Sequence, residues 1–157
     1  MHWIRVLPLA LALAGPSAAR ADSANASQHP RVGELAQLPF ETDSADLPIG
    51  SERALGEIAA WAQANPDGHI VIEGHADGAG TTNHNLDLSL RRADAVRVQL
   101  VTLGIEPDMI IVAGHGESAM GRRVRVWCSR ASVDAIEARL HDRGAKTVRE
   151  SPLIVRR

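Results

Sequence analysis

An acidic residue and a basic residue stand on either side of a junction in the middle of the chain, and their positions suggest a shared ligand. Asp77 lies within residues 74–80, which have the sequence GHADGAG and follow a short apolar run. Arg92 lies near the start of the helical pattern that comes next. In a strand–loop–helix unit the loop and the helix start meet at one edge of the sheet, where ligands bind in open α/β folds. We therefore expect Asp77 and Arg92 to face a common ligand.

The chemistry of this pair suits a zwitterion. A carboxylate such as Asp77 binds an ammonium group, and a guanidinium such as Arg92 binds a carboxylate in a two-pronged contact. Asn85, which lies between them in the sequence, offers both a donor and an acceptor. The alternative is that Asp77 and Arg92 pair with each other at the surface, where an ion pair contributes only about 0–1 kcal/mol.

The periodicity of the apolar residues predicts the elements that position these side chains. The expected strands cover residues 38–41, 69–73, 109–113, 122–128 and 146–155. Three helices are expected: one begins after Ser51, and the others cover residues 88–103 and 132–142. This order predicts an α/β fold, because strand–helix–strand crossovers favour parallel neighbours and short connections favour antiparallel ones. We expect a two-layer sandwich with the helices packed on one face of a mixed parallel/antiparallel sheet.

The N-terminus has the pattern of an export signal. Arg5 supplies a positive charge, residues 6–15 are apolar, and residues 19–21 (ARA) form a small-x-small cleavage sequence. A membrane anchor is the alternative, but the apolar run is shorter than the ~20 residues that span a bilayer. We assign the chain to a signal peptide (1–21), a flexible linker (22–37), a folded domain (38–128), and a C-terminal helix and edge strand without an assigned role (129–157).

Charge and composition argue against nucleic acid as a partner. Without the signal peptide the chain loses two of its 17 basic residues and none of its 19 acidic ones, so its formal net charge falls from −2 to −4. A polyanionic partner is therefore not expected. The aromatic residues are Trp3, Trp61, Trp127 and Phe40. Such a chain has an aliphatic core and offers few stacking platforms for bases.

Metal binding and catalysis have weaker support than ligand binding. His69, His75, His84 and His115 lack the spacing of a recognised zinc motif, so no metal and no cofactor is expected, and His75 is expected to pack or hydrogen-bond beneath the loop. A hydrolase needs paired carboxylates, a metal-bound water or an activated nucleophile. Ser89 and His84 are close only in sequence, and no base is evident for Cys128, the single cysteine. We expect no enzyme.

Cys128 and the last predicted helix each leave an alternative open. Cys128 ends a predicted strand, where it is a buried thiol, the partner in an intermolecular disulfide or a reactive thiol. The helix at residues 132–142 has an apolar stripe of Val133, Ile136 and Leu140, which either covers the sheet or binds a partner protein. The second use would make the domain a protein–protein interaction module.

The region around Asp77 resembles the OmpA-like peptidoglycan-binding domain, which is also found in peptidoglycan-associated lipoproteins and flagellar stator proteins. That family has a signature of roughly Gly-His-Thr-Asp, then Gly, then Asn-x-x-Leu-Ser-x-x-Arg-Ala. The chain matches it at residues 74–77 (GHAD), Gly80 and 85–93 (NLDLSLRRA), and further at 40–47 (FETDSADL), 103–105 (LGI), 114–118 (GHGES) and 122–124 (RRV). The resemblance covers about residues 38–127.

The resemblance implies non-catalytic binding of peptidoglycan in the periplasm of a Gram-negative envelope. In the family, the loop aspartate and the helix arginine hold the diaminopimelate residue of the peptide stem, and these roles fall to Asp77 and Arg92. In the family an asparagine helps to frame the pocket, some members add a second acidic contact, and backbone amides of the loop contribute. The site implied for this chain is Asp77, Arg92, Asn85, Glu41 and the backbone of Ala76 and Gly78. Attachment at the outer membrane and contacts with other envelope proteins are further expectations, with no transmembrane span in the mature chain.

Two departures from the family pattern are expected to open or weaken the pocket. Ala76 stands where the family usually has a threonine, which removes a hydroxyl from the loop. Residues 119–121 alone separate the Gly-Glu-Ser segment from the following strand, where the family usually has a longer insertion. Residues 129–157 lie beyond the resemblance.

Overall fold

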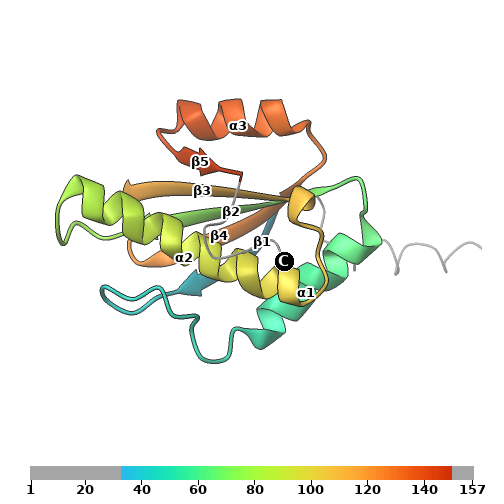
Figure 1. Ribbon diagram of the computed structural model, residues 1–157, viewed down its shortest axis with the longest axis horizontal. Coiled ribbons are helices and arrows are strands. Elements are labelled where there is room, and N and C mark those ends of the chain that lie inside the picture. The colour runs from blue at the N-terminus through green and yellow to red at the C-terminus, as the bar shows by residue number, and fades with distance from the viewer. Residues whose placement is uncertain (1–32, 150–157) are drawn as a thin grey trace, which may run out of the picture.

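One mixed sheet of five strands organises the computed structural model, which describes residues 33–149 (Figure 1). The strands lie in the order β1-β4-β2-β3-β5. Their bounds are β1 Glu34–Pro39, β2 His69–Ala76, β3 Ile110–Glu117, β4 Arg123–Ser129 and β5 Lys146–Val148. The helices are α1 Glu52–Ala64, α2 Thr82–Thr102 and α3 Val133–Asp142, with a short 3₁₀ turn, η1, at Pro107–Met109.

Strand β4 connects the two halves of the sheet. It pairs antiparallel with β1 on one side and with β2 on the other. Strands β2 and β3 are parallel, and β5 pairs antiparallel with the outer edge of β3. The predicted mixed α/β sheet is therefore confirmed, and the parallel pair comes from the β2–α2–β3 crossover.

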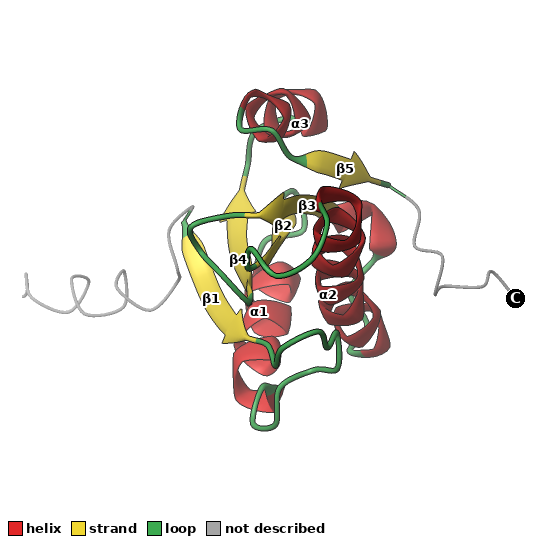
Figure 2. Cartoon of the chain, turned by 90° about the vertical axis from the view of Figure 1, so that its left-hand side faces the viewer, coloured by secondary structure: helices red, strands yellow, loops and turns green. Residues whose placement is uncertain are grey.

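Two hydrophobic clusters cover opposite faces of the sheet. Alternate residues of β2 divide between them: Ile70 and Ile72 face the cluster that includes α1 and α2, whereas Val71 faces α3. Figure 2 shows α3 on the side of the sheet opposite α1. The expectation of helices on one face holds for α1 and α2, and α3 adds a third layer. The apolar stripe of α3 buries Ile136 and Leu140 against the sheet, the first of the two uses predicted for it.

Several boundaries differ from the sequence-based expectation. Strand β1 begins at Glu34, so residues 34–37 belong to the sheet and not to the linker. Helix α2 begins at Thr82 because the side chain of Thr81 accepts a hydrogen bond from the backbone N–H of His84 and caps a stretch too polar to be predicted as helix. The predicted signal peptide and most of the linker lie outside the described residues, as does the end of the predicted edge strand.

Glycines allow α2 to approach the sheet closely at the level of Arg92. A Cβ on Gly74 of β2 would overlap the carbonyl oxygen of Ser89 in α2. A Cβ on Gly114 of β3 would lie 2.6 Å from Cγ of Leu90. The first half of α2 therefore rests on the backbone of two strands, which sets the depth at which its polar side chains enter the fold.

We predict that Gly74→Ala lowers the free energy of unfolding by about 3 kcal/mol, because the added methyl group forces α2 away from β2. Gly56→Ala is the matched control: nothing lies within 4 Å of a Cβ at that exposed position of α1, and the change should stabilise the helix by roughly 0.5–1 kcal/mol. Urea denaturation measures both variants. Equal stability of the two would contradict the close approach.

Candidate ligand-binding site

Asp77 lies directly after β2 and keeps part of its carboxylate in solvent. Its side chain is 30% exposed, and its Oδ2 accepts a hydrogen bond of 2.9 Å from Nη1 of Arg122. This hydrogen bond, together with one from the backbone N–H of Ala79, lowers the pKa of Asp77 below its ordinary value. Asp77 is therefore an ionised carboxylate at neutral pH, with the half-exposed guanidinium of Arg122 beside it.

Arg92 is placed differently from Asp77. It is completely buried, and its guanidinium carbon lies 5.6 Å from the centre of the Phe40 ring. Three backbone carbonyl oxygens accept its hydrogen bonds: Nε donates to Ser44 (2.8 Å), Nη1 to His75 (3.0 Å) and Nη2 to Glu41 (2.7 Å). Burial lowers the pKa of Arg92, but a guanidinium remains protonated at neutral pH. Arg92 thus holds the segment after β1 against the end of β2.

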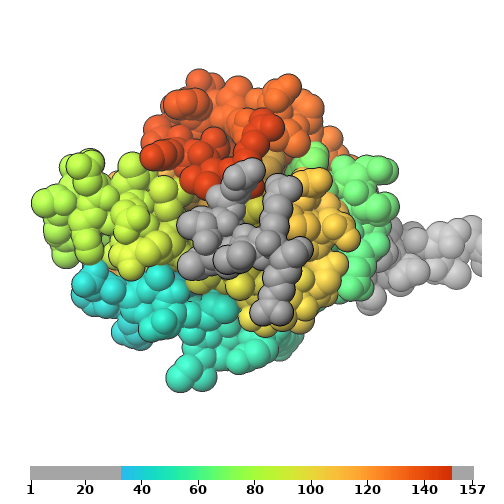
Figure 3. Space-filling view, in the orientation of Figure 1, coloured from blue at the N-terminus to red at the C-terminus, as the bar shows by residue number. Residues whose placement is uncertain are grey.

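This arrangement revises the role expected for Arg92. The two-pronged contact with a ligand carboxylate would need an exposed guanidinium, and none of this side chain is exposed. The simple alternative of an Asp77–Arg92 ion pair is also not observed, because Asp77 pairs with Arg122. Arg92 acts on Asp77 through its charge at longer range. Figure 3 shows the segment after β1 lying against the first half of α2.

Of the other predicted site residues, some are buried beneath the loop and some are exposed on it. Asn85 is fully buried, and neither its Oδ1 nor its Nδ2 has a hydrogen-bond partner among the described residues. It lies beneath the loop, since a Cβ on Gly80 would be 3.4 Å from its Oδ1. Glu41 contributes its carbonyl oxygen to Arg92, and its side chain is exposed. Ala76 is buried with its carbonyl bonded to Ser118, whereas Gly78 is exposed on the loop.

A pocket of about 250 Å³ lies next to Asp77. Its lining consists of Thr42, Asp43, Asp77, Ala79, Gly80, His84 and Leu88. Asp43 has a positive φ of 52° and accepts a hydrogen bond of 2.9 Å from Nε2 of His84, which joins the segment after β1 to the start of α2. Two carboxylates and an imidazole therefore surround an opening beside Arg122.

Sequence reasoning missed three of these polar residues. Asp43 belongs to the stretch that resembles the family's first turn, but its distance from Asp77 in the chain concealed their proximity. His84 was considered only for metal binding or catalysis. Arg122 was assigned only to a strand, and it reaches Asp77 because the following strand, β4, runs antiparallel to β2 with Arg123 opposite His75. Its position in the RRV segment is the signal that would have identified it.

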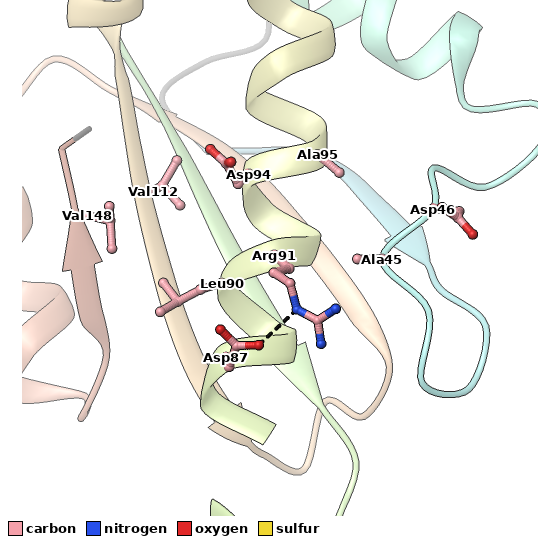
Figure 4. A pocket seen from close by; sticks show the side chains of 9 residues that line it. All are labelled: Ala45, Asp46, Asp87, Leu90, Arg91, Asp94, Ala95, Val112 and Val148. Atoms are coloured by element: carbon pink, nitrogen blue, oxygen red, sulfur yellow. Dashed lines mark ion pairs between the residues drawn. The ribbon is translucent and has the colours of Figure 1, made fainter. Parts of the chain in front are cut away.

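A larger pocket of about 490 Å³ lies elsewhere, between α2 and the edge formed by β3 and β5 (Figure 4). Its lining consists of Ala45, Asp46, Asp87, Leu90, Arg91, Asp94, Ala95, Val112 and Val148. None of the predicted site residues is among them, and the charged groups of Asp87 and Arg91 pair with each other at 2.9 Å. We assign the candidate site to the smaller pocket, because the sequence-predicted carboxylate of Asp77 lines it.

A sequence model of the OmpA family matches residues 39–133, which is more than half of the chain. The chain belongs to the OmpA family. The match begins in β1 and ends at the start of α3, so it includes every element that lines the pocket beside Asp77. The resemblance stated from the sequence motifs is thereby confirmed.

Other members of the OmpA family resemble the chain over different lengths. The peptidoglycan-associated lipoprotein of Pseudomonas putida is 32% identical over 111 residues, and that of Rhizobium meliloti (strain 1021) is 37% identical over 78 residues. These matches cover 69% and 50% of this chain, and the chain spans 66% and 44% of the two relatives.

Solved structures share the fold. The peptidoglycan-associated lipoprotein of Burkholderia pseudomallei has a TM-score of 0.56 and 26% identity, covering 59% of this chain and 89% of its own. The periplasmic domain of Helicobacter pylori MotB has a TM-score of 0.54 at 20% identity, covering 70% and 83%, and shows the fold alone. Among residues 33–149, none of the helices is long and apolar enough to cross a membrane.

We predict that Arg92→Ala lowers the free energy of unfolding by at least about 3 kcal/mol, because three carbonyl oxygens lose their donors inside the fold. Arg91→Ala is the matched control: the neighbouring side chain is 51% exposed and pairs with Asp87, four residues earlier, so its loss should change stability by less than about 1 kcal/mol. Chemical denaturation of both variants checks this. Similar stabilities would show that Arg92 is free to serve the ligand.

Proposed function

We propose that this domain binds the diaminopimelate-containing peptide stem of peptidoglycan without cutting it, and so anchors the chain, or an assembly that includes it, to the cell wall. One observation carries the proposal: the ionised carboxylate of Asp77 borders a pocket of about 250 Å³ and has an exposed guanidinium beside it. The side-chain end of diaminopimelate carries an ammonium and a carboxylate on one carbon. The two protein groups complement these two ligand groups.

The pair of Asp77 and Arg122 gives each half of the ligand a partner. In the free protein the two side chains bond to each other, and Arg122 is 46% exposed. Surface ion pairs contribute only about 0–1 kcal/mol, so opening this one costs little. The ligand ammonium then takes the place of Arg122 at Asp77, and Arg122 turns to the ligand carboxylate, where two parallel hydrogen bonds are available.

The remaining residues of the expected site lie around Asp77 and support the proposed replacement of Arg122 by the ligand ammonium. Arg92 keeps the segment of Glu41 in place and adds positive potential near the ligand carboxylate. Asn85, with no partner in the described residues, offers two polar atoms under the loop that become satisfied if the loop adjusts or admits a water molecule. The exposed backbone of Gly78 offers a further N–H at the rim.

A binding function is better supported than an enzymatic one. The one serine considered as a nucleophile, Ser89, is fully buried, donates its hydroxyl hydrogen to Leu86 and accepts from the backbone of Gly116. Cys128 is also buried. Neither side chain is available to a polymer such as peptidoglycan.

The relatives support a location in the periplasm at the cell wall. Three of the similar proteins are named peptidoglycan-associated lipoproteins. The predicted signal peptide is consistent with export. The alternative, in which α3 binds a partner protein through its apolar stripe, is less well supported, because Ile136 and Leu140 of that stripe are buried against the sheet.

We predict that Asp77→Asn weakens binding to purified diaminopimelate-type sacculi by about 10- to 100-fold, because a charge-assisted contact with the ammonium is lost. Co-sedimentation of the chain from Asp22 onward measures it. Asp87→Asn is the control: this exposed carboxylate borders the larger pocket, and its loss should leave binding unchanged. Equal binding of Asp77→Asn and the unmodified chain would refute the site, and loss of binding in Asp87→Asn would move it to the larger pocket.

The role of Arg122 has its own test. Sacculi whose stem has lysine in place of diaminopimelate keep the ammonium but lack the carboxylate. The unmodified chain should bind them at least about 10-fold more weakly, since a charged hydrogen bond contributes about 1.5–3 kcal/mol. Arg122→Gln should bind both kinds of sacculi alike. If Arg122→Gln still discriminates between them, another group recognises the carboxylate.

A further inference from the structure

A second polar cluster lies on the face of the sheet that α3 partly covers. Glu73 and His75 are alternate residues of β2, and His115 lies on the neighbouring parallel strand β3. One ligand atom from each of the three side chains lies within 4.8 Å of the others. All are enclosed, with side-chain exposures of 2% for Glu73, 4% for His75 and 11% for His115.

One buried nitrogen in this cluster has no hydrogen-bond partner among residues 33–149. Nε2 of His75 is buried without a hydrogen bond to any described residue, and it lies 4.0 Å from Oε2 of Glu73. The other ring nitrogen, Nδ1, lies 2.9 Å from the hydroxyl of Ser118. If Nδ1–H donates to that hydroxyl, Nε2 presents a lone pair toward Glu73. Burial lowers the pKa of His75 to about 4, so the ring is neutral at neutral pH. The expected hydrogen bond of His75 beneath the loop is therefore made by Nδ1, and Nε2 is left without one among the described residues.

The carboxylate of Glu73 is divided between two environments. Its Oε1 accepts hydrogen bonds from Nε1 of Trp127 and Nη2 of Arg143. Its Oε2 accepts one of 3.1 Å from Nε2 of His115 and faces His75. Metal-bound carboxylates are commonly held in this way, with one oxygen oriented by surrounding donors and the other on the ion.

We propose that Oε2 of Glu73, Nε2 of His75 and Nε2 of His115 form a binding site for a divalent transition-metal ion of the zinc class. Two imidazoles and one carboxylate are a donor set that zinc accepts, with a water molecule in the fourth position. The more exposed side, at His115, is the entry path. On binding, His115 gives up its hydrogen bond to Glu73 and carries its ring proton on Nδ1.

Both histidine rings must move before they can bind one ion. The rings of His75 and His115 are stacked, with centres 4.6 Å apart and planes 11° apart, so their Nε2 lone pairs do not yet converge. Bonds of about 2.0–2.2 Å to one ion bring the donors closer and require both rings to rotate out of the stack. Arg143, whose side chain is 39% exposed, can stay on Oε1 or turn to solvent as the ion adds positive charge. The bound ion would join β2 to β3 just before Asp77.

Titration of the chelator-treated full chain with Co²⁺ tests the proposal, because a four-coordinate Co²⁺ site absorbs visible light strongly. We expect saturation at one ion per chain, displacement of Co²⁺ by Zn²⁺ and a higher unfolding temperature with either ion. His75→Gln and His115→Gln should each lose the absorption band and the temperature shift. His84→Gln is the control, since it removes the imidazole paired with Asp43 in the other pocket and should leave both signals unchanged.

Three outcomes would overturn the proposal. One is a titration without saturation in the unmodified chain. Another is an unchanged signal in His115→Gln, whose native circular dichroism spectrum must first show that it is folded. Loss of the signal in His84→Gln alone would assign the ion to the pocket beside Asp77 and also overturn it.

Discussion

The buried guanidinium of Arg92 is the interaction on which the site depends. A charge removed from water must have its donors satisfied, and Arg92 meets this demand with carbonyl oxygens from Glu41, Ser44 and His75. Two of these carbonyls follow β1 and the third lies near the end of β2, segments far apart in the sequence. One side chain therefore sets the distance between the segment that carries Asp43 and the loop that carries Asp77.

This division of labour separates the frame of the site from its ligand-binding surface. Arg92 and Asn85 lie fully inside, where a change affects the fold first. Asp77 and Arg122 lie at the rim, where they are partly exposed and hydrogen-bonded to each other. In the proposed function, a surface pair of this kind keeps both charges available at little energetic cost, because the ligand would replace one weak contact with two stronger ones.

Local patterns predicted much of the fold and part of the site. Alternating apolar residues identified the strands, and the glycine-rich turn after a buried strand identified Asp77. The acceptors of Arg92 are backbone carbonyls, which have no sequence signature, so its burial was not predictable from its residue type. The same limit applies to Arg122 and His115, because each meets its partner through strand pairing. Only the register of β4 with β2, and of β3 with β2, brings them there.

A crystal structure of the chain with a diaminopimelate-containing stem peptide tests the central claim most directly. The account predicts the ligand ammonium at the carboxylate of Asp77, the ligand carboxylate at Arg122, and Arg92 still bonded to its three carbonyl oxygens. A complex in which Arg92 leaves those carbonyls to bind the ligand carboxylate would contradict the account. So would a ligand seated in the larger pocket between α2 and β5.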